Sequence, residues 1–194
     1  SRLFGTWDSV LYYDQVRGPR PLANNPARLE QLRRHAERFV GALDVLRDTR
    51  SPAMVFDLLD RYLERVLLAE GERPAVALIL DYAHFLAPST GVAQTSREVA
   101  GNLATLLNWA RSPYFKKVPF AFCLISERLG DLHEALVQNA HTTRIEIPFP
   151  DRRDRLEYLS WMAAGRSFAD LCEVPIEALA DLCAGLTLVH LQGL

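Results

Sequence analysis

The sequence predicts an α/β protein in which a parallel sheet is followed by a small all-helical region. Two apolar runs, residues 75–80 and 120–125, lead into polar residues, which is typical of strands covered on both faces. Segments with helical spacing of apolar residues alternate with these runs, which indicates parallel strands joined by right-handed crossovers. From Asp151 onward the chain contains helical patterns only.

The first expected strand is residues 10–14, which are β-branched or aromatic and precede a loop rich in Pro, Gly and Asn at residues 18–26. Asn25 then caps a helix with Pro26 at its first position, and apolar residues recur at helical spacing from residue 29 to residue 43. These signals predict a strand, a loop and one amphipathic helix.

Two more helices flank the first apolar run. One opens with Ser51 and Pro52, and the other opens with a capping box formed by Thr95 and Glu98. The second of them must stop before Pro113, because proline cannot continue a helix.

The remaining elements are shorter. We expect a short helix over residues 131–137, and a half-exposed strand over residues 144–147, where apolar and charged residues alternate. Further helices are predicted to start at Asp151, to span residues 175–183 and to start again at Thr187.

Composition excludes several classes of protein. The chain has 194 residues, of which 49% are hydrophobic and 24% charged, so it is neither a disordered tail nor a collagen-like or disulfide-based scaffold. A net charge of −2 gives no general affinity for nucleic acid or acidic membranes. No apolar run reaches 18 residues, and Cys123, Cys172 and Cys183 lie in apolar stretches as expected for buried thiols, so we expect a cytoplasmic protein. The absence of an initial methionine leads us to expect a piece of a longer chain.

Polar residues follow both apolar runs, where a parallel sheet gathers its ligands. Asp81 and Tyr82 follow the first run, and Ser126 and Glu127 end the second. An apolar strand that ends in aspartate can present a carboxylate to hydrated Mg²⁺, so Asp81 is a candidate metal ligand. A structural aspartate that caps the strand end is the simpler explanation of Asp81 taken alone.

The order of motifs after residue 74 closely resembles the later half of an AAA+ ATPase module. The motifs are the strand ending at Asp81, the strand ending at Ser126 and Glu127, the turn at residues 131–136, the segment 144–151 followed by Arg155, and residues 180–188. The resemblance implies a P-loop-NTPase-like core over residues 1–150 and the start of a helical lid over residues 151–194. It also implies a Walker B aspartate at Asp81, a sensor 1 position at Ser126 or Glu127, and an arginine finger at Arg144.

The chain departs from that family at most of the catalytic positions, although Asp81 matches the Walker B aspartate. It contains no Gly-x-x-x-x-Gly-Lys-Ser/Thr string, and its only lysines, Lys116 and Lys117, cannot replace one. Tyr82 stands where the family has a glutamate that polarises water, and tyrosine is a poor base at neutral pH. Glu127 brings a negative charge to a position that is usually neutral, and Arg144 aligns at least one residue away from the finger.

Other sites have weaker support. His84, His133 and His141 could suggest a metal site, but no His or Cys pair has ligand spacing, so surface histidines are the simpler explanation. Trp109 and Trp161 have the spacing of core residues. The first predicted helix has a basic face, which consists of Arg28, Arg33, Arg34 and Arg38. Glutamates of the same helix can form ion pairs with these arginines, so a solvated charged surface is the simpler explanation.

Three hypotheses follow. The first is a degenerate AAA+ module, like the incomplete first module of some tandem proteins, which binds no cofactor itself and acts as a scaffold, assembly or recognition unit beside other AAA+ modules or subunits that hold ATP and Mg²⁺. The second is a genuine ATPase whose phosphate loop lies outside this chain. The third is a protein or nucleic-acid interaction domain unrelated to nucleotide. We favour the first, since the strand at residues 10–14 and the two helices after it already supply early elements of the core.

Overall fold

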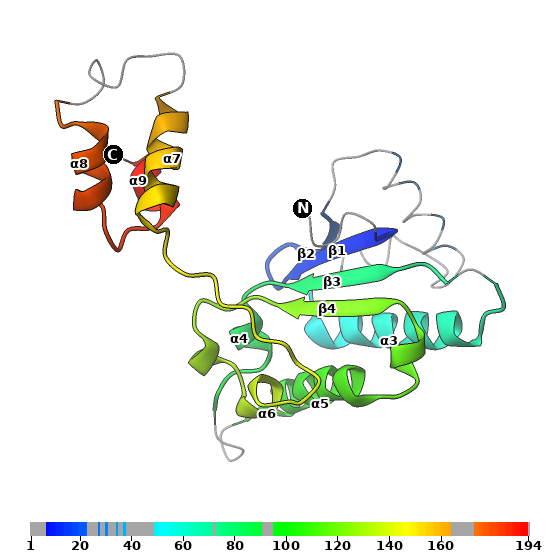
Figure 1. The fold of residues 1–194 in the computed structure, drawn as a ribbon. Helices are drawn as coiled ribbons and strands as arrows, with labels where there is room; N and C mark the ends of the chain where they lie inside the picture. The colour runs from blue at the N-terminus through cyan, green and yellow to red at the C-terminus, as the bar shows by residue number, and fades with distance from the viewer. Residues whose placement is uncertain are drawn as a thin grey trace. The chain divides into compact units, whose positions relative to one another are not determined.

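The protein was analysed as a computed structural model, which describes residues 7–22, 27, 30, 34, 37, 49–71, 73–90, 95–163 and 173–193. The chain divides into two compact units, residues 1–143 and 144–194, and each is described by itself (Figure 1). The helix predicted from Asn25 onward lies mostly outside the described residues; of its expected charged face, Glu30, Arg34 and Glu37 are helical and exposed.

The first unit is built on one sheet with the strand order β2-β1-β3-β4. Strands β1 (Ser9–Asp14), β3 (Val76–Leu80) and β4 (Phe120–Leu124) are parallel, and β2 (Gly18–Pro21) pairs with β1 in the antiparallel sense. The mixed α/β architecture with mainly parallel strands confirms the predicted fold class.

Strand β3 is the centre of the sheet. All five of its residues are buried, and Leu78 lies opposite Leu11 of β1 on one side and Phe122 of β4 on the other. A strand of Val, Ala, Leu and Ile without alternation fits this position, because neither of its faces meets water.

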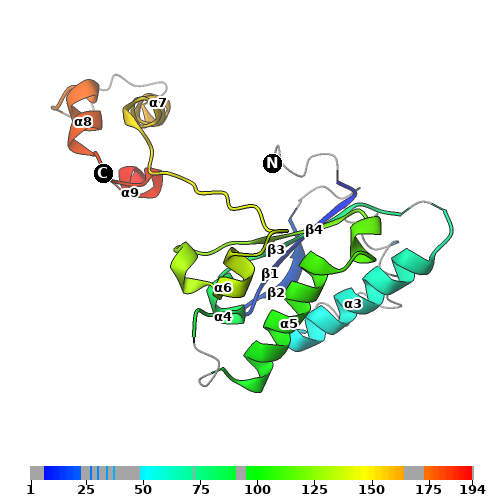
Figure 2. The same ribbon diagram turned by 60° about the horizontal axis from the view of Figure 1, so that its bottom comes forward.

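Helices α3 (Pro52–Leu68) and α5 (Arg97–Arg111) pack together and cover one face of the sheet (Figure 2). Helix α3 starts after Ser51 as predicted. The capping box expected at Thr95 and Glu98 is wrong: Ser96 is the N-cap, and its side chain accepts a hydrogen bond from the Val99 N–H at 3.2 Å. The extended backbone of Ser96 brings its hydroxyl to the first free N–H groups of the helix.

Trp109 joins helix α5 to α3 and to the sheet. Its side chain is 3% exposed, and its ring lies edge-on to Phe56, Phe120 and Phe122 at centroid distances of 5.2, 5.5 and 5.8 Å. Its indole N–H donates a hydrogen bond to the carboxylate of Asp60. The prediction that Trp109 belongs to the core is therefore confirmed.

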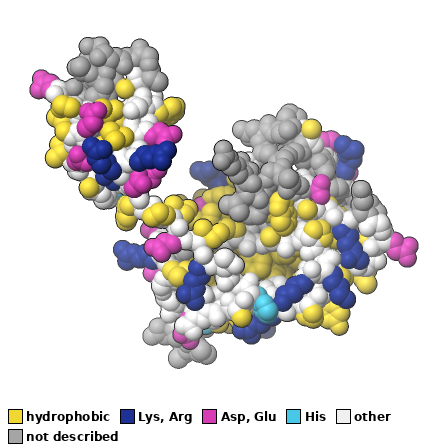
Figure 3. Space-filling view, viewed as in Figure 1, with side chains coloured by type: hydrophobic (Ala, Val, Ile, Leu, Met, Phe, Trp, Pro, Cys, Tyr) yellow, Lys and Arg dark blue, Asp and Glu magenta, His cyan; other side chains and the backbone are white. Residues whose placement is uncertain are grey.

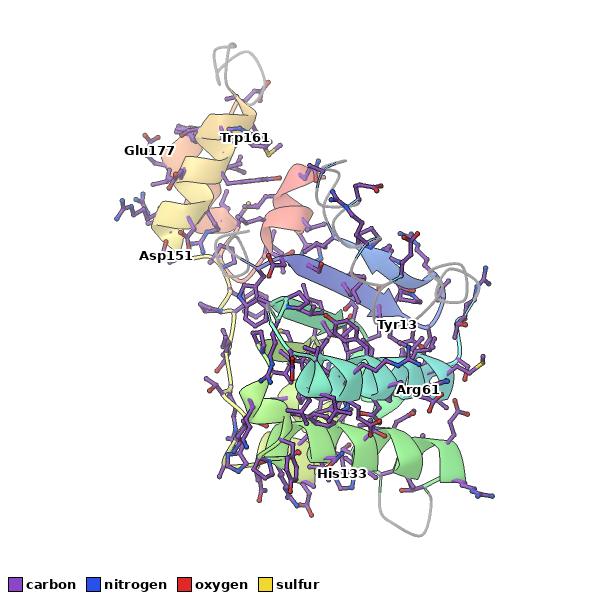
Figure 4. The ribbon with its side chains drawn as sticks, turned by 90° about the vertical axis from the view of Figure 1, so that its right-hand side faces the viewer. Tyr13, Arg61, His133, Asp151, Trp161 and Glu177 are labelled. Atoms are coloured by element: carbon purple, nitrogen blue, oxygen red, sulfur yellow. The ribbon has the colours of Figure 1, made fainter. Side chains whose placement is uncertain are left out.

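The loop predicted at residues 18–26 instead begins with strand β2, which turns back along β1 as a hairpin. Gly18 has a φ of +74°, and a Cβ added there would lie 2.9 Å from the carbonyl oxygen of Thr49, so only glycine fits. Tyr13 in β1 is fully buried and its hydroxyl donates to the carbonyl of Arg50 at 2.7 Å (Figure 4).

Short elements complete the first unit. The helix predicted over residues 131–137 is divided into a 3-10 turn and a four-residue helix α6, because Leu132 forms a bridge with Pro88 between them. These elements are α4 (Ala83–Leu86), the 3-10 helices η2 (Phe115–Lys117) and η3 (Leu129–Asp131), and α6 (Glu134–Val137). Cys123 is half-buried and Cys183 is buried, both as free thiols, while Cys172 lies outside the described residues.

The second unit contains α7 (Arg152–Met162), α8 (Ile176–Leu182) and α9 (Leu188–Gln192). Helix α7 starts at Asp151, as the sequence predicted (Figure 4), and the structure adds a capping box between Asp151 and Asp154. Thr187 starts α9 in the same way.

Within the second unit, the buried guanidinium of Arg155 links α7 to α8 and to the segment before α7. Arg155 is 7% exposed and donates to the carbonyl oxygens of Ala180 at 2.7 Å and Pro150 at 2.6 Å. These bonds satisfy a charge that would otherwise be costly to bury. Among the described residues, no helix of either unit is long and apolar enough to cross a membrane.

Two predictions for the second unit are wrong. Residues 144–147 are extended but form no strand, since no described strand pairs with them, and Ile145 and Ile147 are 71% and 89% exposed. Trp161 is 68% exposed rather than buried, because none of the described residues covers that part of α7. Helical spacing identifies an apolar position but cannot supply the element that must cover it.

We predict that replacing Asp60 with Asn stabilises the protein at neutral pH. Burial raises the pKa of Asp60 more than the hydrogen bond from Trp109 lowers it. The contribution of Asp60 to the free energy of unfolding therefore falls as pH rises above its unfolded pKa of about 3.9. An amide keeps the acceptor for Trp109 without the charge, so urea unfolding should show the variant gaining stability over the wild type between pH 3 and pH 7.

The exposed residue Glu70, which follows α3, provides the control. Glu70→Gln should give no such gain, and a difference between Asp60→Asn and the wild type that stays constant with pH would contradict the prediction.

Candidate functional site

The carboxyl ends of the parallel strands bring together four of the residues singled out from the sequence. Asp81 and Tyr82 follow β3, and Ser126 and Glu127 follow β4. The backbone links the two strand ends: the Ile125 N–H donates to the Leu80 carbonyl at 2.8 Å, and the Ala83 N–H donates to the Ile125 carbonyl at 2.9 Å.

Both carboxylate oxygens of Asp81 accept hydrogen bonds within the protein. The Tyr12 hydroxyl of β1 donates to Oδ2, and the Tyr82 N–H donates to Oδ1 at 2.9 Å. The hydrogen bond to Asp81, together with burial and the negative charge of Asp81, raises the pKa of Tyr12 to about 12. Asp81 therefore joins the ends of β1 and β3.

Tyr82 occupies a strained position. Its φ of 51° and ψ of 41° are left-handed, a conformation that costs a side-chain-bearing residue about 1–2 kcal/mol. Its side chain is 51% exposed and lies near His84 and Phe85, with ring centroids 6.3 and 6.4 Å away. The residue after Asp81 thus presents an exposed aromatic ring rather than a carboxylate base.

Ser126 and Glu127 differ in their surroundings. The Ser126 hydroxyl donates to the Arg128 carbonyl at 2.9 Å and lies 3.4 Å from Nδ1 of His84. Glu127 is exposed at the tip of β4. The Ser126 hydroxyl therefore stabilises the turn after β4, whereas the carboxylate of Glu127 is exposed to water.

The turn after β1 is organised by Asp14, which sequence reasoning missed. Asp14 Oδ1 accepts the N–H groups of Val16 and Arg17 at 3.0 and 2.7 Å, and Oδ2 pairs with Arg20 at 2.8 Å. Burial raises the pKa of Asp14, but the backbone N–H of Arg17 and the Arg20 guanidinium outweigh it and lower that pKa. Aspartate before a tight turn is the signal that could have identified it.

Arg20 connects this turn to Asp81. Its guanidinium lies 4.5 Å from the centre of the Tyr12 ring, and Tyr12 in turn donates to Asp81. We call Tyr12, Asp14, Arg20 and Asp81 the tip network.

The tip network already uses groups that a magnesium nucleotide would need. Asp81 accepts one hydrogen bond on each oxygen, so fewer of its lone pairs are open to hydrated Mg²⁺. A phosphate loop needs free N–H groups, yet those of Val16 and Arg17 donate to Asp14, and Pro19 and Pro21 have none. In the described part of the chain, no group of three or more His, Cys, Asp or Glu side chains could hold a metal ion.

Arg144, the predicted arginine finger, belongs to the second unit and is exposed. Its role as an arginine finger stays a prediction.

We predict that Asp81 controls the ionisation of Tyr12. In Asp81→Asn the pKa of Tyr12 should fall from about 12 toward the ordinary value of about 10, because the charged acceptor is lost. Nuclear magnetic resonance of labelled tyrosine at pH 11 would show Tyr12 mainly protonated in the wild type and largely ionised in the variant. Tyr13 is the internal control, since burial raises its pKa. Equal shifts at both tyrosines would indicate unfolding rather than a lost contact.

Comparison with known proteins agrees with this architecture. Residues 1–148 match the family model described as AAA+ chaperone, N-terminal Rossmann-like domain, and residues 153–194 match that of the AAA+ chaperone, second helical domain. No curated protein matches the chain.

One similar solved chain comes from a complex described as E. coli MS115-1 HORMA:CdnC:Trip13. The similarity has a TM-score of 0.51 at 24% identity and covers 76% of the present chain, which spans 46% of that chain. At this identity the likeness shows the fold alone. Because the first family model covers most of the sequence and the second continues it, the chain belongs to the AAA+ chaperone family, with a Rossmann-like domain followed by a helical domain.

Proposed function

We propose that this chain is a catalytically degenerate AAA+ module that acts as a scaffold, assembly or partner-recognition unit of a larger AAA+ ATPase. The observation that carries the proposal is the hydrogen bonding of Asp81. Its two oxygens accept from the Tyr12 hydroxyl and the Tyr82 N–H, so the aspartate serves as a structural link between strands rather than as a metal ligand.

The surroundings of Asp81 support the same proposal. Tyr82 replaces the expected base with an exposed ring, and Glu127 offers a charge that would repel a phosphate. Asp14 occupies the turn after β1 and takes up two N–H groups that an anion would need. The change at Tyr82 weakens ATP hydrolysis, because the general base is lost. The changes at Glu127 and Asp14 weaken triphosphate binding, because one adds a negative charge and the other occupies N–H donors.

The proposed partners are other AAA+ modules or subunits of the same assembly, which would hold the ATP and Mg²⁺. A chain of similar fold was solved within a multi-protein complex, which is consistent with a role in assembly. The family match favours an AAA+ origin over an interaction domain unrelated to nucleotide.

A second candidate function is a genuine ATPase whose phosphate loop lies outside residues 1–194. The position of Asp81 favours it: the residue follows the central buried strand and is only half-buried. For this function to hold, the bond from Tyr12 to Asp81 would have to open when Mg²⁺ binds.

Calorimetric titration of residues 1–194 with Mg·ATP tests the first proposal directly. We expect no dissociation constant below about 1 mM, which corresponds to about −4 kcal/mol. A dissociation constant near 1 μM, or about −8 kcal/mol, would contradict the degenerate module.

The ATPase rate of the full-length natural polypeptide separates the two candidates. If Asp81 is structural, Asp81→Asn leaves the rate within twofold of the wild type, as does the charge-matched surface control Asp57→Asn. If Asp81 holds Mg²⁺, only Asp81→Asn abolishes ATP turnover at this module, and a loss of more than tenfold would refute the first proposal. Circular dichroism of each variant checks that the fold is retained.

A further inference from the structure

A pocket lies beside α5 and α6 in the first unit, and none of its lining residues belongs to the tip network. The two helices pack together (Figure 2), and the pocket has a volume of about 470 Å³. Its lining comes from the last residue of α5, from α6 and from the turn that follows α6. The polar residues of the lining are Arg111, Glu134, Gln138, Asn139 and His141. All of them except Glu134 can donate a hydrogen bond from a side-chain nitrogen.

Asn139 brings to this pocket a donor that lacks an acceptor. The residue is 8% exposed, and its Nδ2 is buried without a hydrogen-bond partner among the described residues. Its Oδ1 accepts the His141 N–H at 3.0 Å, which fixes the orientation of the amide, because a flipped amide would turn its NH₂ group toward that N–H. Buried donors are normally paired, so a ligand oxygen at the floor of the pocket would supply the missing acceptor.

The positive charges around the pocket are not neutralised by neighbouring carboxylates. Arg111 is exposed at the end of α5, and Nζ of Lys116 lies 3.4 Å from Nδ1 of His141. Lys117 comes next, with its Nζ 5.9 Å from the centre of the exposed Tyr114 ring. In the part of the chain that the structure describes, no Asp or Glu forms an ion pair with Arg111, Lys116 or Lys117. These cations are therefore available to an anion from another molecule.

Lysine occurs only beside this pocket. Of the 22 basic residues of the chain, Lys116 and Lys117 are the only lysines, and both lie in η2, which precedes β4. Figure 3 shows a histidine among basic side chains on the surface of the first unit, in the region that α5 occupies in Figure 1. Positive charge thus gathers at the amino end of β4, whereas Ser126 and Glu127 lie at its carboxyl end.

Glu134 limits the negative charge that the pocket can accept. It lines the pocket, and the carbonyl end of α5 adds a partial negative charge near Arg111. Both repel a doubly charged phosphate more strongly than a singly charged carboxylate. A carboxylate also matches the donors, since an amide N–H, a guanidinium and an ammonium group all donate to carboxylate oxygens.

We propose that this pocket binds a carboxylate side chain from an acidic segment of a partner protein, with Asn139, Arg111 and Lys116 as its donors. A segment with several Asp or Glu residues fits better than a free carboxylate, because Lys117 and Tyr114 extend the basic surface beyond the pocket. The inference goes beyond the proposed function, since it concerns the amino end of β4 and not the strand ends around Asp81.

Binding of a hexaglutamate peptide to the full-length natural polypeptide tests the inference. Fluorescence anisotropy of the labelled peptide should show saturable binding that Arg111→Gln weakens at least tenfold. The control is Arg97→Gln, which removes an exposed arginine at the other end of the same helix and should change the dissociation constant less than twofold. Equal losses in the two variants would overturn the inference, as would the absence of binding at about 1 mM peptide.

Two further variants test the lining of the pocket. Asn139→Asp keeps an oxygen for the His141 N–H but replaces the buried donor with a charged oxygen, so it should weaken binding at least tenfold. Glu134→Gln removes a repelling charge and should tighten binding at least threefold, a gain that misfolding cannot produce. Unchanged affinity in Glu134→Gln would refute the placement of the carboxylate in this pocket.

Competition with other anions separates the remaining explanations. Hexaglutamate should displace the labelled peptide at concentrations at least tenfold lower than acetylglutamate, inorganic phosphate or a single-stranded oligothymidine. Equal competition by acetylglutamate would indicate a small-molecule site, and stronger competition by phosphate or the oligonucleotide would indicate a phosphate-binding surface; each result would overturn the inference. Asp81→Asn should leave hexaglutamate binding within twofold, so failure of the proposed function and failure of this inference are distinguishable.

Discussion

The burial of β3 between two parallel neighbours is the constraint on which the first unit depends. A strand that is covered on both faces and hydrogen-bonded on both edges can expose polar groups only at its ends. Asp81 is the first polar residue after β3, so the sheet itself determines where this carboxylate lies. Helices α3 and α5 then bury the face of the sheet that carries Phe120 and Phe122, against which Trp109 of α5 packs.

At the carboxyl end of that sheet, several polar side chains interact with one another within the protein. Asp14 pairs with Arg20, the Arg20 guanidinium lies over Tyr12, and Tyr12 donates to Asp81. The four side chains come from three strands, so the tip network ties the strand ends together. These polar contacts therefore stabilise the strand ends of the Rossmann-like domain.

The two edges of the sheet also differ in composition. Strand β2 contains two prolines and Arg20, whereas β4 is entirely apolar and, among the described residues, no strand pairs with its outer edge. In the second unit, residues 144–147 are likewise extended without a described strand partner, and Ile147 is largely exposed. Strands need partners that a local sequence cannot reveal, which is why the sequence predicted a strand at 144–147 and the structure has none.

The sequence by itself determined the elements whose signals are local. The continuous apolar run of β3, the Pro52 start of α3 and the Asp151 start of α7 all depend on neighbouring residues, and all are present. It also identified Asp81, Tyr82, Ser126 and Glu127 as strand-end residues. Only the tertiary structure decided what these residues contact: the bond from Tyr12 to Asp81 joins residues 69 positions apart. The exposure of Trp161 was decided in the same way, because burial depends on which distant segments pack together and no periodicity encodes that.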